Sequence, residues 1–331
     1  MISAVAPGKL MFSGEYAILY GQPAITMSIN MYACTHIIPN NKPCFHFKSN
    51  QINFSATSVL TELSTIREQV ILRYQMFLKG QLSILKVFNH QGEIIQWAVS
   101  YFLTHFNCHN KLGFDLEIIS DIPIGGGLGS SAALIISLLK SLSAYYDIAV
   151  SCSQYVKLGQ IIEQMQHGYS SGIDIKTSLK QGYLYFHQGK VVHHSAPPKL
   201  PIYLVYTGTP ETNTGECVAY VTKNTQPQYW KKFSQLTQAM YNALNNTCLE
   251  EIKRLLKINH RLLNGIGVVP LRIQQFIAQI ENIKGAGKIC GAGACRGEAG
   301  GAVLVLTEKK LALQKLCKKY NYLLYDLNLS R

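Results

Sequence analysis

Two carboxylates, Glu163 and Asp174, stand eleven residues apart in the segment EQMQHGYSSGID. Paired carboxylates can divide the work of phosphoryl transfer, because one can hold Mg²⁺ while the other accepts the proton of a reacting hydroxyl. The alternative interpretation is an ordinary surface connection, in which a helix ends in a loop rich in serine and glycine. For His167, in the same turn, we favour a structural role at a helix end over a catalytic one.

Four glycines and two serines form a second chemical feature, between a predicted strand and a predicted helix. With the leucine between the third and fourth glycines, this glycine turn comprises Gly125, Gly126, Gly127, Leu128, Gly129, Ser130 and Ser131. Glycines let a backbone approach a ligand closely, and the unpaired N–H groups at a helix start favour phosphate. Either serine hydroxyl could contact a phosphate-bound Mg²⁺. A purely structural strand-to-helix turn would need only one or two glycines.

Two other nucleotide motifs compete for this glycine turn. Gly127 to Ala132 fits the dinucleotide pattern G-x-G-x-x-A, and Asp147 follows at about the distance of its acidic residue. Asp147, however, comes directly after the helix and not at the end of a second full strand. A P-loop requires a lysine before its serine or threonine, and Gly129 stands there instead. Taken alone, the turn predicts an anion site and leaves NAD and ATP open.

Charged and glycine-rich residues recur in two further stretches. Lys9 and Glu15, in APGKLMFSGEY, could orient a substrate or steady a reacting hydroxyl, or they could lie on the solvated face of an N-terminal hairpin. The stretch 285–306, GAGKICGAGACRGEAGGAVLVL, is on the plainest interpretation a glycine-rich hairpin that leads into a buried strand. Thr207, after a predicted strand, carries a hydroxyl that could approach a substrate.

The candidate residues described above come from both halves of the chain, so strands and helices of both halves must position them. Short strands are expected in the first 60 residues and helices over 58–78, 92–106, 153–168, 226–246, 248–264 and 269–283. The chain ends in a strand–helix–strand pattern. Both halves mix the two element types, so we predict an α+β fold with domains 1–193 and 194–331.

Composition narrows the function classes. The chain has 331 residues, 47% of them hydrophobic and 15% charged, which predicts a well-packed cytoplasmic protein of two domains. Its formal charge of +13 favours anionic partners, but no zinc-finger or RNA-binding signature is present, so we expect no nucleic acid partner. The sequence predicts no signal peptide and no membrane span. Nine scattered cysteines without a CxxC pair indicate reduced thiols.

Three stretches resemble the motifs of the GHMP kinases, in the family's order and over nearly the whole chain. APGKLMFSGEY resembles the first motif, the glycine turn the second and residues 285–306 the third. The resemblance implies an N-terminal domain like the second domain of ribosomal protein S5 and a ferredoxin-like C-terminal domain. It also implies ATP and Mg²⁺ as cofactors. Two departures stand out: Ser170 replaces a family proline, and Cys295 to Glu298 lengthen the third motif. Arg296 in this insertion could reach an anion or pair with Glu298.

The resemblance also implies roles for individual residues. Asp174 would be the catalytic base, Lys9 would lie near the reacting hydroxyl, and residues 125–131 would hold the ATP phosphates. Glu163 and Ser131, or Ser130 in its place, would bind Mg²⁺. On the substrate side it implies Glu15, Tyr16, Thr207, Gly291, Ala292 and Gly293. Because Lys9, Glu163 and Asp174 occur together, we favour an active kinase over an RNA-binding scaffold with an inactive kinase fold.

Two acceptors remain open within this resemblance. LYGQPAI and SGID lean toward mevalonate, whereas Tyr16, where mevalonate kinases usually carry histidine, leans toward phosphomevalonate. We favour mevalonate, with phosphomevalonate as the alternative and a homodimer as an open oligomeric state.

Overall fold

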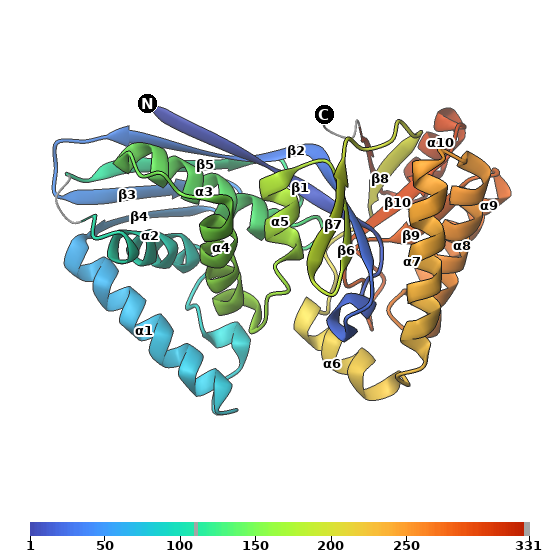
Figure 1. The fold of residues 1–331 in the computed structure, drawn as a ribbon, viewed down its shortest axis with the longest axis horizontal. Helices are drawn as coiled ribbons and strands as arrows, with labels where there is room; N and C mark the ends of the chain where they lie inside the picture. The colour runs from blue at the N-terminus through green and yellow to red at the C-terminus, as the bar shows by residue number, and fades with distance from the viewer. Residues whose placement is uncertain (109–111, 328–331) are drawn as a thin grey trace. The chain divides into compact units, whose positions relative to one another are not determined.

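The chain forms two compact units, each made of segments that are not consecutive in sequence (Figure 1). The structure is a computed structural model that describes residues 1–108 and 112–327. Unit 1 comprises Met1–Pro7, Met31–Ile122 and Ser131–Leu179, and unit 2 comprises Gly8–Asn30, Pro123–Ser130 and Lys180–Arg331. The glycine turn therefore belongs to unit 2, while most of the helix that follows it belongs to unit 1.

Unit 1 is built on a sheet in the order β4-β3-β5-β2, in which only β3 and β5 run parallel. Its strands are β3 (Cys44–Ser49), β4 (Phe54–Val59), β5 (Phe114–Ser120) and the second half of β2 (Ala24–Pro39). Its helices are α1 (Leu60–Leu78), η2 (Ile84–Lys86), α2 (Glu93–His105), α3 (Ser130–Tyr146), α4 (Cys152–His167) and α5 (Ile173–Lys180).

Helix α3 is buried on most of its surface and is anchored to strand β2. Small serines on α3 allow a close approach to the strand: the Ser137 and Thr35 hydroxyls lie 2.9 Å apart, and Ser141 donates to the Thr35 carbonyl oxygen at 2.8 Å. Both serines are buried, so these bonds satisfy hydroxyls that would otherwise be costly to remove from water. This anchoring fixes the position of the helix that continues from the glycine turn.

Unit 2 contains an antiparallel sheet in the order β11-β8-β10-β9. Its strands are β8 (Ile202–Tyr206), β9 (Ala286–Ile289), β10 (Ala302–Leu306) and β11 (Leu323–Asp326), and its helices are α6 (Thr214–Asn224), α7 (Tyr229–Asn245), α8 (Leu249–Gly265), α9 (Leu271–Asn282) and α10 (Lys310–Tyr320). The unit also holds η1 (Ala17–Tyr20), β6 (Tyr183–His187), β7 (Lys190–Ser195) and the second half of β1 (Ile2–Ser13). Numbered in chain order, the four strands of the sheet lie as 4-1-3-2, which confirms the predicted ferredoxin-like arrangement.

Helices α8 and α9 pack on the edge strand β9, and α7 packs on α8 (Figure 1). On α8 the buried apolar residues Ile252, Leu255, Leu256 and Leu263 recur at helical spacing, as expected for a helix with one face on a sheet. Every residue of β10 is buried, and the strand pairs with β8 on one edge and with β9 on the other. The core of unit 2 therefore forms around the strand that follows the third motif.

The mixed α+β class is confirmed, and the predicted bounds of α7, α8 and α9 are close to those observed. The N-terminal strands are longer than predicted, since β1 runs unbroken through Pro7 and Gly8. Within residues 1–108 and 112–327, β2 is the one strand that pairs with β1, and a proline is tolerated at such a sheet edge. The single domain boundary after residue 193 stays a prediction. Among the described residues, no helix combines the length and apolarity needed to cross a membrane.

Candidate active site

The glycine turn of unit 2 is fastened by backbone hydrogen bonds to two strands. The Lys9 N–H of β1 donates to the Leu128 carbonyl oxygen at 2.8 Å, and the Ala302 N–H at the start of β10 donates to the Gly126 carbonyl oxygen at 3.1 Å. The Tyr206 hydroxyl donates to the Ile124 carbonyl oxygen at 3.2 Å. With these carbonyls engaged, the turn has a defined backbone course before α3 begins.

Gly127 of this turn packs directly against the third motif. It has a φ of 75°, and a Cβ atom there would lie 2.4 Å from the Cys290 carbonyl oxygen. A Cβ on Gly291 would in turn lie 2.8 Å from the Gly127 Cα. Only glycines permit this approach, so the structure brings together two of the three motifs that the sequence singled out.

Lys9 lies beside the last glycine of the turn. Its side chain is 3% exposed, and a Cβ on Gly129 would lie 2.8 Å from the Lys9 Cγ. The missing side chain of Gly129, whose φ is 69°, thus gives the lysine stem its space. The sequence predicted Lys9 as a catalytic residue, and the structure places it against the predicted phosphate turn.

Glu15 forms a buried ion pair with Lys288 of β9, a residue that the sequence analysis missed. Both side chains are almost fully buried. The Lys288 ammonium donates to Glu15 Oε1, to the Met11 carbonyl oxygen at 2.9 Å and to the Ile289 carbonyl oxygen at 2.8 Å. All three of its protons are engaged, whereas Glu15 Oε2 is buried without a hydrogen-bond partner among the described residues. One signal was present in the sequence: a single lysine inside the otherwise apolar strand GAGKIC.

Tyr16, a residue of the first motif, forms a hydrogen bond with the third motif. It has a φ of 57°, and its buried hydroxyl donates to the Ala292 carbonyl oxygen at 2.5 Å. Burial raises the pKa of the Tyr16 phenol far above its usual value, so it stays a hydrogen-bond donor. Gly293, with a φ of 61°, leaves room for the Val268 carbonyl oxygen, which would lie 2.2 Å from a Cβ at that position. Two predicted substrate residues, Tyr16 and Ala292, are therefore in contact.

Thr207 follows β8 and uses its hydroxyl within the protein. The hydroxyl donates to the Gly301 carbonyl oxygen at 2.8 Å and accepts from the Gly300 N–H at 3.0 Å. These bonds hold the segment that leads into β10. The predicted contact of Thr207 with a substrate stays a prediction.

The insertion in the third motif is tied to two helices. Arg296 pairs with Glu216 of α6 at 2.9 Å, and Glu298 pairs with Arg272 of α9 at 2.8 Å. The sequence had offered a salt bridge between Arg296 and Glu298 as one explanation of this turn. That explanation is wrong, because each of the two charges finds its partner on a different helix.

In unit 1, the Ser170 hydroxyl donates a hydrogen bond to Glu163 Oε2. Glu163 lies near the end of α4 and is 7% exposed. Ser170 Oγ also accepts from the Gly172 N–H at 3.1 Å, so one hydroxyl orients the carboxylate and shapes the turn into α5. The departure of Ser170 from the family's proline thus has a structural role in this chain.

Asp174 lies in the first turn of α5, within electrostatic reach of His167. Desolvation by surrounding protein lowers the pKa of the His167 imidazole, and the Asp174 carboxylate opposes this shift. Tyr74 of α1 donates to the Gly168 carbonyl oxygen at 3.0 Å and holds the end of α4. The structure therefore brings Asp174 and His167 together, in a turn braced by α1.

The predicted magnesium residues offer hard oxygen donors of the right chemistry. No group of three or more His, Cys, Asp or Glu side chains among residues 1–108 and 112–327 could hold a metal ion alone. Mg²⁺ in kinases, however, keeps several waters and binds one or two carboxylates together with substrate phosphates. A carboxylate from Glu163 and a hydroxyl from Ser131 or Ser130 fit that requirement.

Near Lys288, the buried His260 of α8 predicts a loss of stability in acid. Burial, with lesser contributions from Arg261 and Lys288, lowers its pKa from 6.5 to about 4. Below pH 6.5 the unfolded chain therefore takes up a proton that the folded chain does not accept until about pH 4. We expect His260 to reduce the free energy of unfolding by about 2 kcal/mol between pH 7 and pH 5, measured by urea denaturation.

His260→Gln should flatten this pH dependence, while His187→Gln, at an exposed position, should leave it unchanged. Equal slopes for the parent and His260→Gln would show that other groups cause the acid loss.

Comparisons with known proteins agree with this geometry. Residues 93–182 match the family model of the GHMP kinases N terminal domain. The chain is 28% identical over 322 residues to a mevalonate kinase of Thermococcus onnurineus, a match that covers 93% of this chain and 90% of the relative.

Two solved structures share the fold. The Methanococcus jannaschii mevalonate kinase superposes with a TM-score of 0.83 at 23% identity, over 99% of this chain and 98% of that chain. A Streptococcus pneumoniae phosphomevalonate kinase, solved with phosphomevalonate and AMPPNP, superposes with a TM-score of 0.70 at 17% identity, over 98% of this chain and all of that one. The fold alone therefore does not choose between the two acceptors.

Proposed function

Because the chain belongs to the GHMP kinase family, we propose that it is an ATP-dependent kinase that phosphorylates the hydroxyl of mevalonate. The observation that carries this proposal is the match to a mevalonate kinase along 93% of the chain. The buried pairing of the first and third motifs supports it, because these are the motifs on the substrate side in the family resemblance.

The ATP phosphates would lie on residues 125–131. Small residues allow the backbone to approach the phosphates, and the start of α3 adds N–H groups and the positive end of its dipole. The carbonyls of Gly126 and Leu128 are already engaged within the protein, so the turn can keep its shape when ATP binds or leaves. Such preorganisation is the main contribution that a protein makes to phosphoryl transfer.

Asp174 would accept the proton of the mevalonate hydroxyl, and Lys9 would stabilise the negative charge that develops during transfer. The low exposure of Lys9 strengthens its interaction with that charge, because little water is present to screen it. Glu15 would accept a hydrogen bond from the substrate through Oε2, the oxygen that Lys288 leaves unused.

Mg²⁺ would be held by Glu163 and by Ser131 or Ser130. When bound, the ion neutralises phosphate charge and orients the transferred group. The hydrogen bond from Ser170 would help Glu163 to bind the ion, because it holds one carboxylate oxygen of Glu163 in place.

The acceptor is tested by a coupled ADP-release assay with mevalonate and 5-phosphomevalonate side by side. We expect kcat/KM for mevalonate to exceed that for phosphomevalonate by at least about tenfold. The reverse order would establish phosphomevalonate as the acceptor, and no ADP release with either compound would reject the proposal. Homodimeric assembly and a cytoplasmic location stay predictions.

A further inference from the structure

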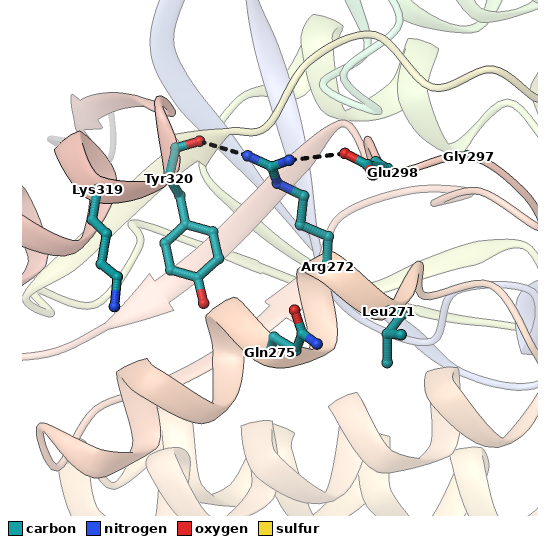
Figure 2. A pocket seen from close by; sticks show the side chains of 7 residues that line it. All are labelled: Leu271, Arg272, Gln275, Gly297, Glu298, Lys319 and Tyr320. Atoms are coloured by element: carbon teal, nitrogen blue, oxygen red, sulfur yellow. Dashed lines mark hydrogen bonds and ion pairs between the residues drawn. The ribbon is translucent and has the colours of Figure 1, made fainter.

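A cavity of about 410 Å³ lies in unit 2 between the start of α9, the end of α10 and the insertion in the third motif (Figure 2). Its lining residues are Leu271, Arg272, Gln275, Gly297, Glu298, Lys319 and Tyr320. None of them is among the residues that the proposed reaction uses. A volume of this size is within the range of small-molecule sites in proteins.

Arg272 is held in place by two chain segments beside this cavity. Its guanidinium donates to Glu298 Oε2 at 2.8 Å and to the Tyr320 carbonyl oxygen at 3.3 Å, and Figure 2 shows these two bonds on either side of it. The guanidinium also lies 5.9 Å from the centre of the Tyr322 ring. A fixed guanidinium with several donors is well suited to bind phosphate oxygens.

Lys319 adds a second cation to the same lining. No carboxylate of the described part of the chain lies within ion-pair distance of its ammonium, whereas Lys310, at the other end of α10, is paired with Asp326. The lining thus carries two positive side chains and one negative one, Glu298. The cavity has an excess of positive charge that the protein itself does not neutralise.

The one carboxylate in the lining is replaceable. The side chains of Arg272 and Glu298 are 44% and 76% exposed, and exposed ion pairs contribute little to stability because water competes for both charges. A ligand with two or more negative charges can displace Glu298 from Arg272 and contact Lys319 as well.

We propose that this cavity is a second binding site, for a small molecule that carries a phosphate or diphosphate group. Arg272 and Lys319 bind the phosphate oxygens, and Glu298 acts as an internal competitor that occupies Arg272 in the empty site. The site is distinct from the proposed mevalonate site: Gly297 and Glu298 belong to the insertion in the third motif, but no residue of the lining is one that the proposed reaction uses.

Inorganic pyrophosphate is the probe, titrated calorimetrically into protein whose ATP site is filled with AMPPNP. We expect binding of one equivalent to persist with the analogue present. Lys319→Gln should weaken it by about tenfold, the effect of losing one charge-assisted hydrogen bond. Glu298→Gln should strengthen it a few-fold, since the competing carboxylate is gone.

Lys318→Gln is the matched control, because it removes the same charge from the adjacent exposed position of α10, outside the lining. It should leave the affinity within about twofold. Binding that AMPPNP abolishes, or no binding at all, would overturn the proposal. An equal loss of pyrophosphate affinity in Lys318→Gln and Lys319→Gln would also overturn the proposal. It would show that pyrophosphate is attracted by the general positive charge of α10 and not by a defined site. Lys319 has an exposed side chain, so its variant should fold.

Discussion

Asp174→Asn is expected to lower kcat by about two to four orders of magnitude and to leave ATP affinity largely intact. The substitution keeps the size and shape of the side chain but removes the carboxylate that would accept the hydroxyl proton, and positioned acid–base groups contribute factors of this size. Steady-state ADP release gives the turnover, and titration with AMPPNP gives the affinity. Turnover within about twofold of the parent would reject Asp174 as the base.

Asp147→Asn is the control for this substitution, and it also tests the dinucleotide alternative. Asp147 is exposed at the end of α3 and has a φ of 56°, a conformation that asparagine adopts readily. In a dinucleotide site it would be the acidic residue that contacts a ribose. The proposed kinase mechanism gives Asp147 no chemical role. We therefore expect the turnover and ATP affinity of Asp147→Asn to match those of the parent.

A histidine titration followed by NMR separates a local effect of Asp174→Asn from a general disturbance of the fold. The Asp174 carboxylate raises the pKa of His167 against the desolvation that lowers it. Removing the charge should therefore lower the pKa of His167 further. This readout does not depend on turnover, and it reports that Asp174 faces His167 in the folded protein.

Sequence periodicity predicted α7, α8 and α9 well because each has an apolar face at helical spacing, as on α8. It missed α5, whose eight residues are too few to show a period. Local contacts start this helix: Ser171 Oγ accepts from the Ile173 N–H at 3.4 Å, and Gly172 closes the turn before it. Asp174 was therefore predicted in a loop, whereas it lies on a helix whose backbone fixes its direction.

The sequence indicated parts of the candidate site where a residue type has one main structural use, as glycine has at a close backbone approach. Gly127 was singled out because glycines let a backbone approach a ligand, and Gly291 because of the family resemblance. In the structure the two glycines approach each other, while their contact with a ligand stays a prediction. The partner of Glu15 was not predictable in this way. Lys288 stands 273 positions further along the chain, and pairing over such a separation depends on the tertiary fold. A lysine inside an apolar strand signals that a carboxylate must be near, but it does not say which one.

Lys288→Met is expected to destabilise the protein by about 3–5 kcal/mol, the usual cost of removing one partner from a buried ion pair. Methionine approximates the length of the lysine stem but leaves the Glu15 carboxylate without its counter-charge. It also leaves the carbonyl oxygens of Met11 and Ile289 without the donors that now satisfy them. Urea denaturation of the parent and the variant at pH 7 measures the difference in the free energy of unfolding.

Lys253→Met makes the same substitution where the carboxylates stay in water. Lys253 of α8 pairs with Glu250 and Glu308, whose side chains are 82% and 66% exposed. Because both can be hydrated after the lysine is lost, we expect a cost of about 1 kcal/mol or less. Similar losses in the two variants would mean that the methionine, and not the stranded charge, is responsible.

The double variant Glu15→Gln/Lys288→Met shows whether the stranded charge is the cause. It removes the negative charge that Lys288→Met leaves buried, so it should be more stable than Lys288→Met alone by about 1–3 kcal/mol. Glu15→Gln keeps Lys288 bonded to two carbonyl oxygens, so it should fold even if Lys288→Met does not. In that case, a double variant that folds shows by itself that removing the Glu15 charge offsets the loss of Lys288. A double variant less stable than both single variants would contradict the buried pair. If the expected order holds, Lys288 fixes the position of the Glu15 carboxylate, which we propose to contact the substrate, inside the protein.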